Sequence, residues 1–232
     1  PQFQKCCGRG QWADLRRVVP PPPEYLRRLL TEQTTEAIHF RQNIRRYNSL
    51  FAFTSFGADY DPDLANGAQG VYTFRIQGTT YGYAAQGMLP PADGTPGFLQ
   101  IYFHDGAEQD DIRLNQGLAE NLDPNVVRQL RQVIQEVNPY AQQFQHAYGM
   151  FRSDPSQDLY LRLESTTNPT RGHRDQYGLP AAAEVSAFIP GNADTLGPAY
   201  RDVIIATHGG GLQRIHEEHP HYDPLHYVLL FP

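Results

Sequence analysis

The sequence predicts an α+β fold in which helices pack on one face of a mainly antiparallel sheet. Aromatic and β-branched residues alternate at period two in several short runs, which is typical of strands with one buried face. Elsewhere, and most clearly after residue 123, apolar residues recur at helical spacing. The 20 glycines and 19 prolines in 232 residues indicate a loop-rich chain. A hydrophobic content of 40% is enough to build a core in a chain of this length.

Two helices are expected before the sheet. A proline run at 20–23 forms a stiff spacer, because proline fixes φ and lacks an N–H group. Residues 24–30 then place tyrosine and leucine on one helical face, with two arginines outside it. A second helix is expected from Thr35, whose hydroxyl can cap it, through Tyr47.

The sheet is expected mainly in the stretch that follows this second helix. Its strand-like runs lie at 51–57, 71–76, 81–83 and 98–103. A loop rich in glycine and proline separates the last two runs. The acidic segment 105–111 lacks the regular spacing of a calcium loop, so we expect a solvated connector there and no cation site.

The second half of the chain predicts two more helices and a second group of strands. Asp123-Pro124 starts the first helix and Asn138-Pro139 separates it from the next. The further strands are expected at 159–163, 185–189, 203–206 and 212–215, with a hairpin turn at Gly209–Gly211. We expect a cysteine-containing segment and linker at 1–23, an α+β core at 24–167 and a strand-rich extension at 168–232, the last either separate or one domain with the core.

Charge is distributed unevenly along the chain. The formal net charge is −6, yet residues 1–46 hold nine Lys or Arg against four acids, which leaves −11 for the remainder. The negative net charge argues against nucleic-acid binding over the whole surface, and any surface that contacts DNA is expected near the N-terminus. The arginines predicted to contact DNA are Arg41, Arg45 and Arg46 first, and then Arg16, Arg17, Arg27 and Arg28. The alternative is an ordinary solvated helix face.

The only two cysteines are adjacent, at Cys6 and Cys7. A disulfide between neighbours is strained, and two thiolates do not complete the four-ligand shell of a structural zinc ion. By themselves they are two ordinary reduced thiols.

Five of the nine histidines lie between His208 and His226, so a metal-dependent enzyme must be weighed. His216 and His219 are three residues apart, whereas the zinc-protease motif needs four. Rolling-circle nucleases place their metal-binding histidine pair on a strand. His219 and His221 flank a proline, which cannot donate a hydrogen bond to a sheet, so this pair does not fit that motif. The glycine run at 209–211 lacks the Gly-Lys-Ser/Thr ending of an ATP-binding loop. No complete catalytic motif is present.

Several motifs resemble one family in collinear order. The order N-I-R-x-Y-N, F-A-F-x-S-x-G, F-R-I-x-G, L-P and L-Q-I-Y-x-x-D runs from residue 43 to residue 105. An N-P-x-A-x-x-F pattern follows at 138–144, and H-P-x-Y-D-P-L stands at 219–225. This order resembles the region that leads into the helicase-like domain of Helitron transposon proteins, which are rolling-circle transposases with a nuclease and a helicase.

The resemblance implies zinc ligands, cofactors, a cellular location and partners that the residues alone do not indicate. In the family a Cys-Cys pair follows earlier cysteines in a small zinc-binding unit, so Cys6 and Cys7 would be zinc ligands whose partners precede Pro1. ATP and magnesium or manganese would serve the downstream helicase and nuclease, and no cofactor would belong to this chain itself. The protein would be nuclear, with DNA, preferably single-stranded, and the downstream domains as partners.

Two functional hypotheses follow, with a third kept open. The first is a non-catalytic N-terminal region of a Helitron-like transposase that supports DNA engagement by the downstream domains. The second is a protein-interaction scaffold without a nucleic-acid role, and the third is a metal-dependent enzyme that uses the C-terminal histidines. No apolar run approaches the ~20 residues needed to span a bilayer, so no membrane partner is expected.

Overall fold

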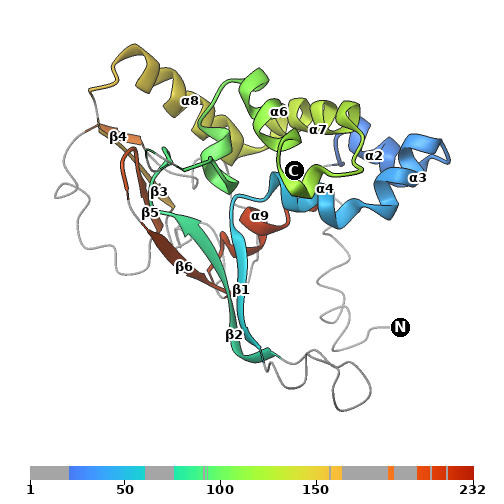
Figure 1. The fold of residues 1–232 in the computed structure, drawn as a ribbon, viewed down its shortest axis with the longest axis horizontal. Coiled ribbons are helices and arrows are strands. Elements are labelled where there is room, and N and C mark those ends of the chain that lie inside the picture. The colour runs from blue at the N-terminus through green and yellow to red at the C-terminus, as the bar shows by residue number, and fades with distance from the viewer. Residues whose placement is uncertain are drawn as a thin grey trace.

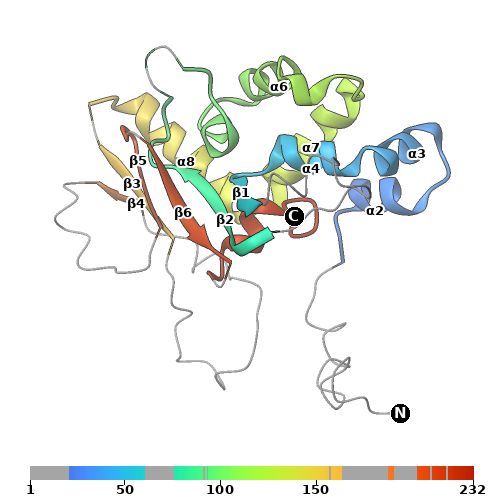
Figure 2. The same cartoon turned by 60° about the horizontal axis from the view of Figure 1, so that its bottom comes forward.

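The fold combines helices with two small antiparallel sheets. The structure, a computed structural model, describes residues 21–60, 76–90, 92, 94–156, 158–163, 188–190, 203–209, 211–217 and 219–232. Within these residues the chain forms seven α-helices and six strands. Most of the helices lie together on one side of the sheets (Figures 1 and 2). The predicted α+β class, with antiparallel strands and many loops, is confirmed.

Three short helices precede the first strand: α2 (Glu24–Thr31), α3 (Thr35–Gln42) and α4 (Ile44–Phe51). The predicted helix at 24–30 is confirmed. The cap of α3 is Thr34 and not Thr35 as expected, and its hydroxyl accepts from the Ala37 N–H at 3.2 Å. The single helix expected up to Tyr47 is wrong, because Asn43 interrupts it with φ −115° and ψ 14°. Its side-chain amide donates to the His39 carbonyl at 3.0 Å, which satisfies the end of α3.

The acidic segment after residue 104 is a helix, α6 (Gly106–Leu114), and the prediction of a solvated connector is wrong. Asp105 caps it by accepting from the Glu108 N–H at 3.0 Å. Gln109 and Arg113 lie on its buried face. Polar residues therefore line the interior side of α6. The apolar residues at helical spacing that identify the other helices are missing there, so the sequence does not reveal this helix.

The run at 98–103 is also not a strand, contrary to prediction. Residues Phe98–Tyr102 form a 3₁₀ helix, η2. The neighbouring side chains of Ile101 and Tyr102 are both buried, whereas a strand with one buried face would expose one of the two. The Gln100 amide donates to the carbonyls of Gly87 and Leu89, at 3.1 and 3.2 Å, and so fixes η2 beside the preceding loop.

The two predicted helices of the second half are confirmed as α7 (Pro124–Val137) and α8 (Pro139–Ser153). Asp123 and Asn138 cap them, and each is followed by a proline that suits the first helical position. A short 3₁₀ turn, η3 (Gly117–Ala119), precedes α7. A five-residue helix, α9 (Tyr222–His226), lies near the C-terminus.

Two three-stranded sheets are present in the described part of the chain. One has the order β1 (Ser55–Tyr60), β2 (Ile76–Ala85), β6 (Leu212–His216), and the other has the order β4 (Phe188–Pro190), β3 (Leu159–Leu163), β5 (Val203–Ala206). Every pairing within them is antiparallel. The predicted strands at 159–163 and 203–206 are confirmed.

The sheets meet where the chain leaves β2. Gly87 forms a parallel bridge with Ala206, and a Cβ atom on Gly209 would lie 2.4 Å from the Gln86 carbonyl oxygen. Only glycine permits so close an approach of two backbones. The predicted hairpin at Gly209–Gly211 is wrong, because β5 and β6 join different sheets and β6 pairs with β2.

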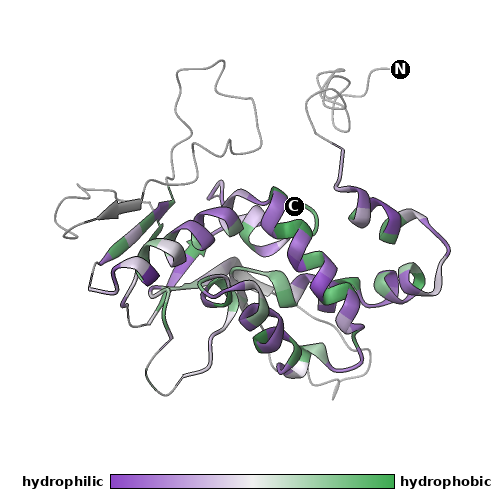
Figure 3. Ribbon diagram, turned by 90° about the horizontal axis from the view of Figure 1, so that it is seen from above, coloured by the Kyte–Doolittle hydropathy of each residue, from purple (hydrophilic) through white to green (hydrophobic). Residues whose placement is uncertain are grey.

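A buried core of apolar residues lies between the helices and the sheets. Figure 3 shows where hydrophobic and hydrophilic residues lie along these elements. At its centre the chain turns from α4 into β1. The Tyr102 hydroxyl donates to the Phe51 carbonyl at 2.6 Å, and the Arg113 guanidinium donates through Nε to the Leu50 carbonyl at 3.2 Å. Both side chains therefore satisfy carbonyls that the C-terminus of α4 leaves open.

Several sequence predictions fall on residues outside the described part of the chain. These are Cys6, Cys7, Arg16, Arg17, the proline at 20, the run 71–75, the expected boundary between residues 167 and 168, and residues 185–187.

Candidate nucleic-acid interface

The arginines of α2 are engaged in ion pairs along their own helix. Arg27 donates through Nε to Glu24 at 2.8 Å, and Arg28 donates to Glu32 at 3.0 Å. All four side chains are exposed, so each pair contributes little to stability. This arrangement fits the alternative of a solvated helix face for Arg27 and Arg28.

Arg41 stabilises the end of α2. Its Nη1 donates to the carbonyls of Leu29 and Glu32, at 2.9 and 2.7 Å. A guanidinium at the C-terminus of a helix satisfies open carbonyls and complements the helix dipole. The predicted DNA contact at Arg41 therefore falls on a half-buried side chain that already has a role in the fold.

Arg45 and Arg46 differ from the other described members of the predicted arginine group. They lie in the first turn of α4, where Arg45 is exposed and Arg46 half-buried. Within the described residues neither guanidinium group has a hydrogen bond or an ion pair. Two cations at the positive end of a helix dipole are electrostatically unfavourable unless an anion joins them.

The aromatic residues beside these arginines belong to the core. Tyr47 and Phe51 are fully buried, and the Tyr47 hydroxyl accepts from the Asp123 N–H at 3.0 Å. Both residues therefore pack in the core. They are not accessible for stacking on bases.

A second group of side chains, which no sequence motif had singled out, lies on the outer face of the β1–β2–β6 sheet. Tyr81 and Tyr83 on β2 face His216 and Arg214 on β6, with which they pair in register. We call these four residues the outer-face row. The Arg214 guanidinium carbon lies 4.9 Å from the centre of the Tyr81 ring and 5.7 Å from that of Tyr83. The tyrosines are partly exposed, and Arg214 and His216 are exposed.

Alternation explains why these side chains share a face. Successive residues of a strand point to opposite sides, so Gly82 and Ala84 face inward while the two tyrosines face outward. A Cβ atom on Gly82 would lie 3.7 Å from the Tyr222 ring, because α9 covers the inner face there. The Tyr-x-Tyr spacing was a visible signal, whereas the pairing of Tyr83 with Arg214, 131 residues later, was not.

The C-terminal histidines do not converge on a common centre in the described residues. No group of three or more His, Cys, Asp or Glu suited to a metal is found there. The Nδ1 atom of His221 is 2.6 Å from the Tyr140 hydroxyl, and that of His219 accepts from the His221 N–H at 3.3 Å. Both rings thus help to hold the turn into α9.

His226 gives the fold a pH dependence. Its ring packs near the rings of Phe56 and Tyr227, with centroids 5.9 and 4.7 Å away. Burial lowers the pKa of His226. A hydrogen bond to the Thr54 backbone and the nearby Asp223 carboxylate act in the opposite direction but are weaker. The unfolded chain therefore binds a proton more readily than the folded one, so stability falls as the pH drops below about 6.5. Urea unfolding at several pH values should show this loss, and His226→Gln should reduce it. An unchanged pH profile in that variant would contradict the assignment.

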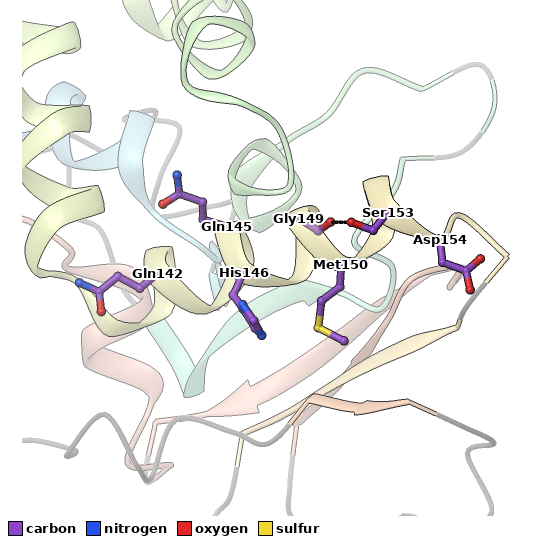
Figure 4. A pocket seen from close by; sticks show the side chains of 7 residues that line it. All are labelled: Gln142, Gln145, His146, Gly149, Met150, Ser153 and Asp154. Carbon is purple, nitrogen blue, oxygen red and sulfur yellow. Dashed lines mark hydrogen bonds between the residues drawn. The ribbon is translucent and has the colours of Figure 1, made fainter.

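A depression of about 660 Å³ lies along α8. Figure 4 shows its lining residues along and just after this helix: Gln142, Gln145, His146, Gly149, Met150, Ser153 and Asp154. The Ser153 hydroxyl donates to the carbonyl of Gly149 at 3.0 Å. The polar groups do not converge on one point, so we assign no site here.

Comparison of the chain with protein-family models, with curated proteins and with solved structures found no match in any of the three. In the part of the chain that the structure describes, no helix is long and apolar enough to cross a membrane.

Proposed function

We propose that this chain is a non-catalytic accessory region of a Helitron-like transposase that holds single-stranded DNA for downstream nuclease and helicase domains. The observation that carries the DNA-binding part is the pair Arg45 and Arg46, whose guanidinium groups have no partner among the described residues. The transposase setting rests on the family resemblance of the sequence motifs. In that setting the protein is nuclear, and ATP and magnesium or manganese serve the downstream domains.

The contrast between arginines supports a phosphate-binding role for this pair. Arg27 and Arg28 are compensated by carboxylates, and Arg41 is held by backbone carbonyls. Arg45 and Arg46 carry uncompensated charge beside the N-terminus of α4, where the helix dipole also favours an anion. Binding of a phosphate there would release counterions from the nucleic acid, and affinity would fall as salt rises.

The test is fluorescence anisotropy of a labelled single-stranded DNA oligonucleotide across a salt series. We expect Arg45→Gln combined with Arg46→Gln to weaken binding and to make the salt slope shallower by about 1.4, because each phosphate contact contributes about 0.7 for single strands. The matched control combines Arg27→Gln with Arg28→Gln, which removes the same charge from an ion-paired helix face. Equal effects in both double variants, or absence of binding by the wild type, would contradict the proposal.

A protein-interaction scaffold is the second candidate. Leu230 is 72% exposed and Tyr227 is 41% exposed, next to the buried Leu229. Exposed apolar residues at the end of the described chain suit a contact with another protein. A purified chain that ignores DNA but binds the downstream domains of the same protein in a pull-down would favour this candidate.

A further inference from the structure

We propose that the outer-face row is a stacking site for single-stranded nucleic acid, with bases against the Tyr81 and Tyr83 rings and a phosphate on Arg214. The inference deepens the proposed function and rests on it, because it names where bases are held in addition to phosphates. It is carried by residues on β2 and β6, separate from the arginines of α4.

The spacing of the two rings selects a single strand. Tyr81 and Tyr83 are two residues apart on β2, which separates their Cα atoms by about 6.6 Å. Stacked bases along one strand of a duplex are only about 3.4 Å apart. Bases that rest on the two rings must therefore be unstacked from each other, and a duplex does not allow this. Aromatic platforms of this kind bind single strands with little sequence preference, because every base has a π-face.

The charges around the row complement a phosphate backbone. Within the described residues the Arg214 guanidinium has no ion pair, and its contacts are the two tyrosine rings. The Glu217 carboxylate, just beyond β6, accepts from the Thr80 hydroxyl at 2.9 Å. Thr80 alternates with Tyr81 and so lies on the opposite face of β2. The Glu217 carboxylate is thereby held away from the outer-face row. Arg214 is the cation of the row that would bind a phosphate.

Placement on a sheet makes the row a preformed site. The inner face beneath it is packed, since Gly82, Ala84 and Ile215 are buried. Three hydrogen-bonded strands fix the spacing of the rings before any ligand arrives. A ligand therefore meets two oriented rings and one cation without the cost of ordering a loop.

The experiment measures binding of labelled oligo-dT and oligo-U of 15 nucleotides, and of a DNA duplex of equal length, by anisotropy. We expect Tyr83→Ala to weaken single-strand binding about 5- to 150-fold, the range that loss of one stacked base predicts. Tyr83→Phe, which keeps the ring, should bind within about twofold of the wild type. Arg214→Gln should weaken binding and reduce the salt slope by about 0.7. Comparison of oligo-dT with oligo-U tells whether the sugar is read.

The outcomes separate this inference from the proposed function. If wild-type chain binds and the Arg45/Arg46 double variant weakens binding, while Tyr83→Ala and Arg214→Gln bind normally, the row is not the site and the proposed function stands. Preference for the duplex would overturn the stacking site. Absence of all binding would overturn both, and a protein partner would then be the better occupant. Circular dichroism checks folding; if Tyr83→Ala does not fold, Arg214→Gln decides, because this exposed side chain makes no hydrogen bond within the described residues.

Discussion

Arg113→Ala is expected to lower the free energy of unfolding by about 3 kcal/mol, the sum of a cavity and lost hydrogen bonds to buried groups. Arg113 is fully buried, and its guanidinium carbon lies 4.7 Å from the ring centres of both Phe51 and Tyr102. It donates to the Leu50 carbonyl and, at 3.1 Å, to the Gln109 side-chain oxygen. Burial lowers its pKa, a sign of how strongly the site is desolvated.

Urea unfolding followed by circular dichroism measures this loss, with Arg113→Met as the matched control. Methionine fills most of the space between the two rings but donates no hydrogen bond. We therefore expect Arg113→Met to be destabilised less than Arg113→Ala. A change below about 0.5 kcal/mol in Arg113→Ala, the range of ordinary surface substitutions, would show that the guanidinium does not hold the end of α4.

Phe53→Ala is expected to cost about 3–5 kcal/mol, as for other large aromatic residues removed from cores. The Phe53 ring is fully buried and stacks on Tyr102 with centroids 4.1 Å apart and planes at 17°. Tyr140 and Phe144 of α8 pack around it at 5.6 and 5.9 Å. Its removal therefore opens a cavity where α8, η2 and the start of β1 meet.

Phe53→Leu is the control for this prediction, because it keeps much of the buried apolar volume and should cost clearly less. The backbone N–H of Phe53 donates to the Leu225 carbonyl at 2.8 Å and is retained in both variants. Equal stability of the two variants in urea unfolding would mean that the ring stack contributes nothing beyond bulk hydrophobicity.

Local signals predicted the elements with strong periodicity. Asp123 followed by Pro124, and then apolar residues at helical spacing, identified α7 within a residue of its observed bounds. The signal failed at α6, whose interior face carries Gln109 and Arg113 rather than apolar residues. The periodicity also failed at η2, because a run of buried aromatic and apolar residues suits a strand equally well. The hydrogen bonds from Gln100 to the neighbouring loop, which fix η2, are tertiary contacts that the local sequence does not reveal.

The candidate sites show a different limit of sequence reasoning. A count of charges predicts a DNA contact for Arg41 and Arg45 alike. The Arg41 guanidinium, however, donates to carbonyls at the end of α2, whereas Arg45 has no hydrogen bond within the described residues. Their distinction depends on tertiary hydrogen bonds, which a charge count does not contain. Likewise, Tyr81 and Tyr83 were visible as a pair, but Arg214 lies beside them only because it pairs with Tyr83, 131 residues earlier in the chain.

The central claim is that the chain holds a single strand against the outer-face row, and photo-crosslinking tests it most directly. Wild-type chain is irradiated with a single-stranded oligonucleotide containing 5-iododeoxyuridine, and the adducts are mapped by mass spectrometry. Bases that stack on tyrosine should crosslink to Tyr81 or Tyr83, and an excess of unlabelled single strand should suppress the adduct more than duplex does. Adducts confined to other parts of the chain, or none at an oligonucleotide concentration that saturates binding, would contradict the account.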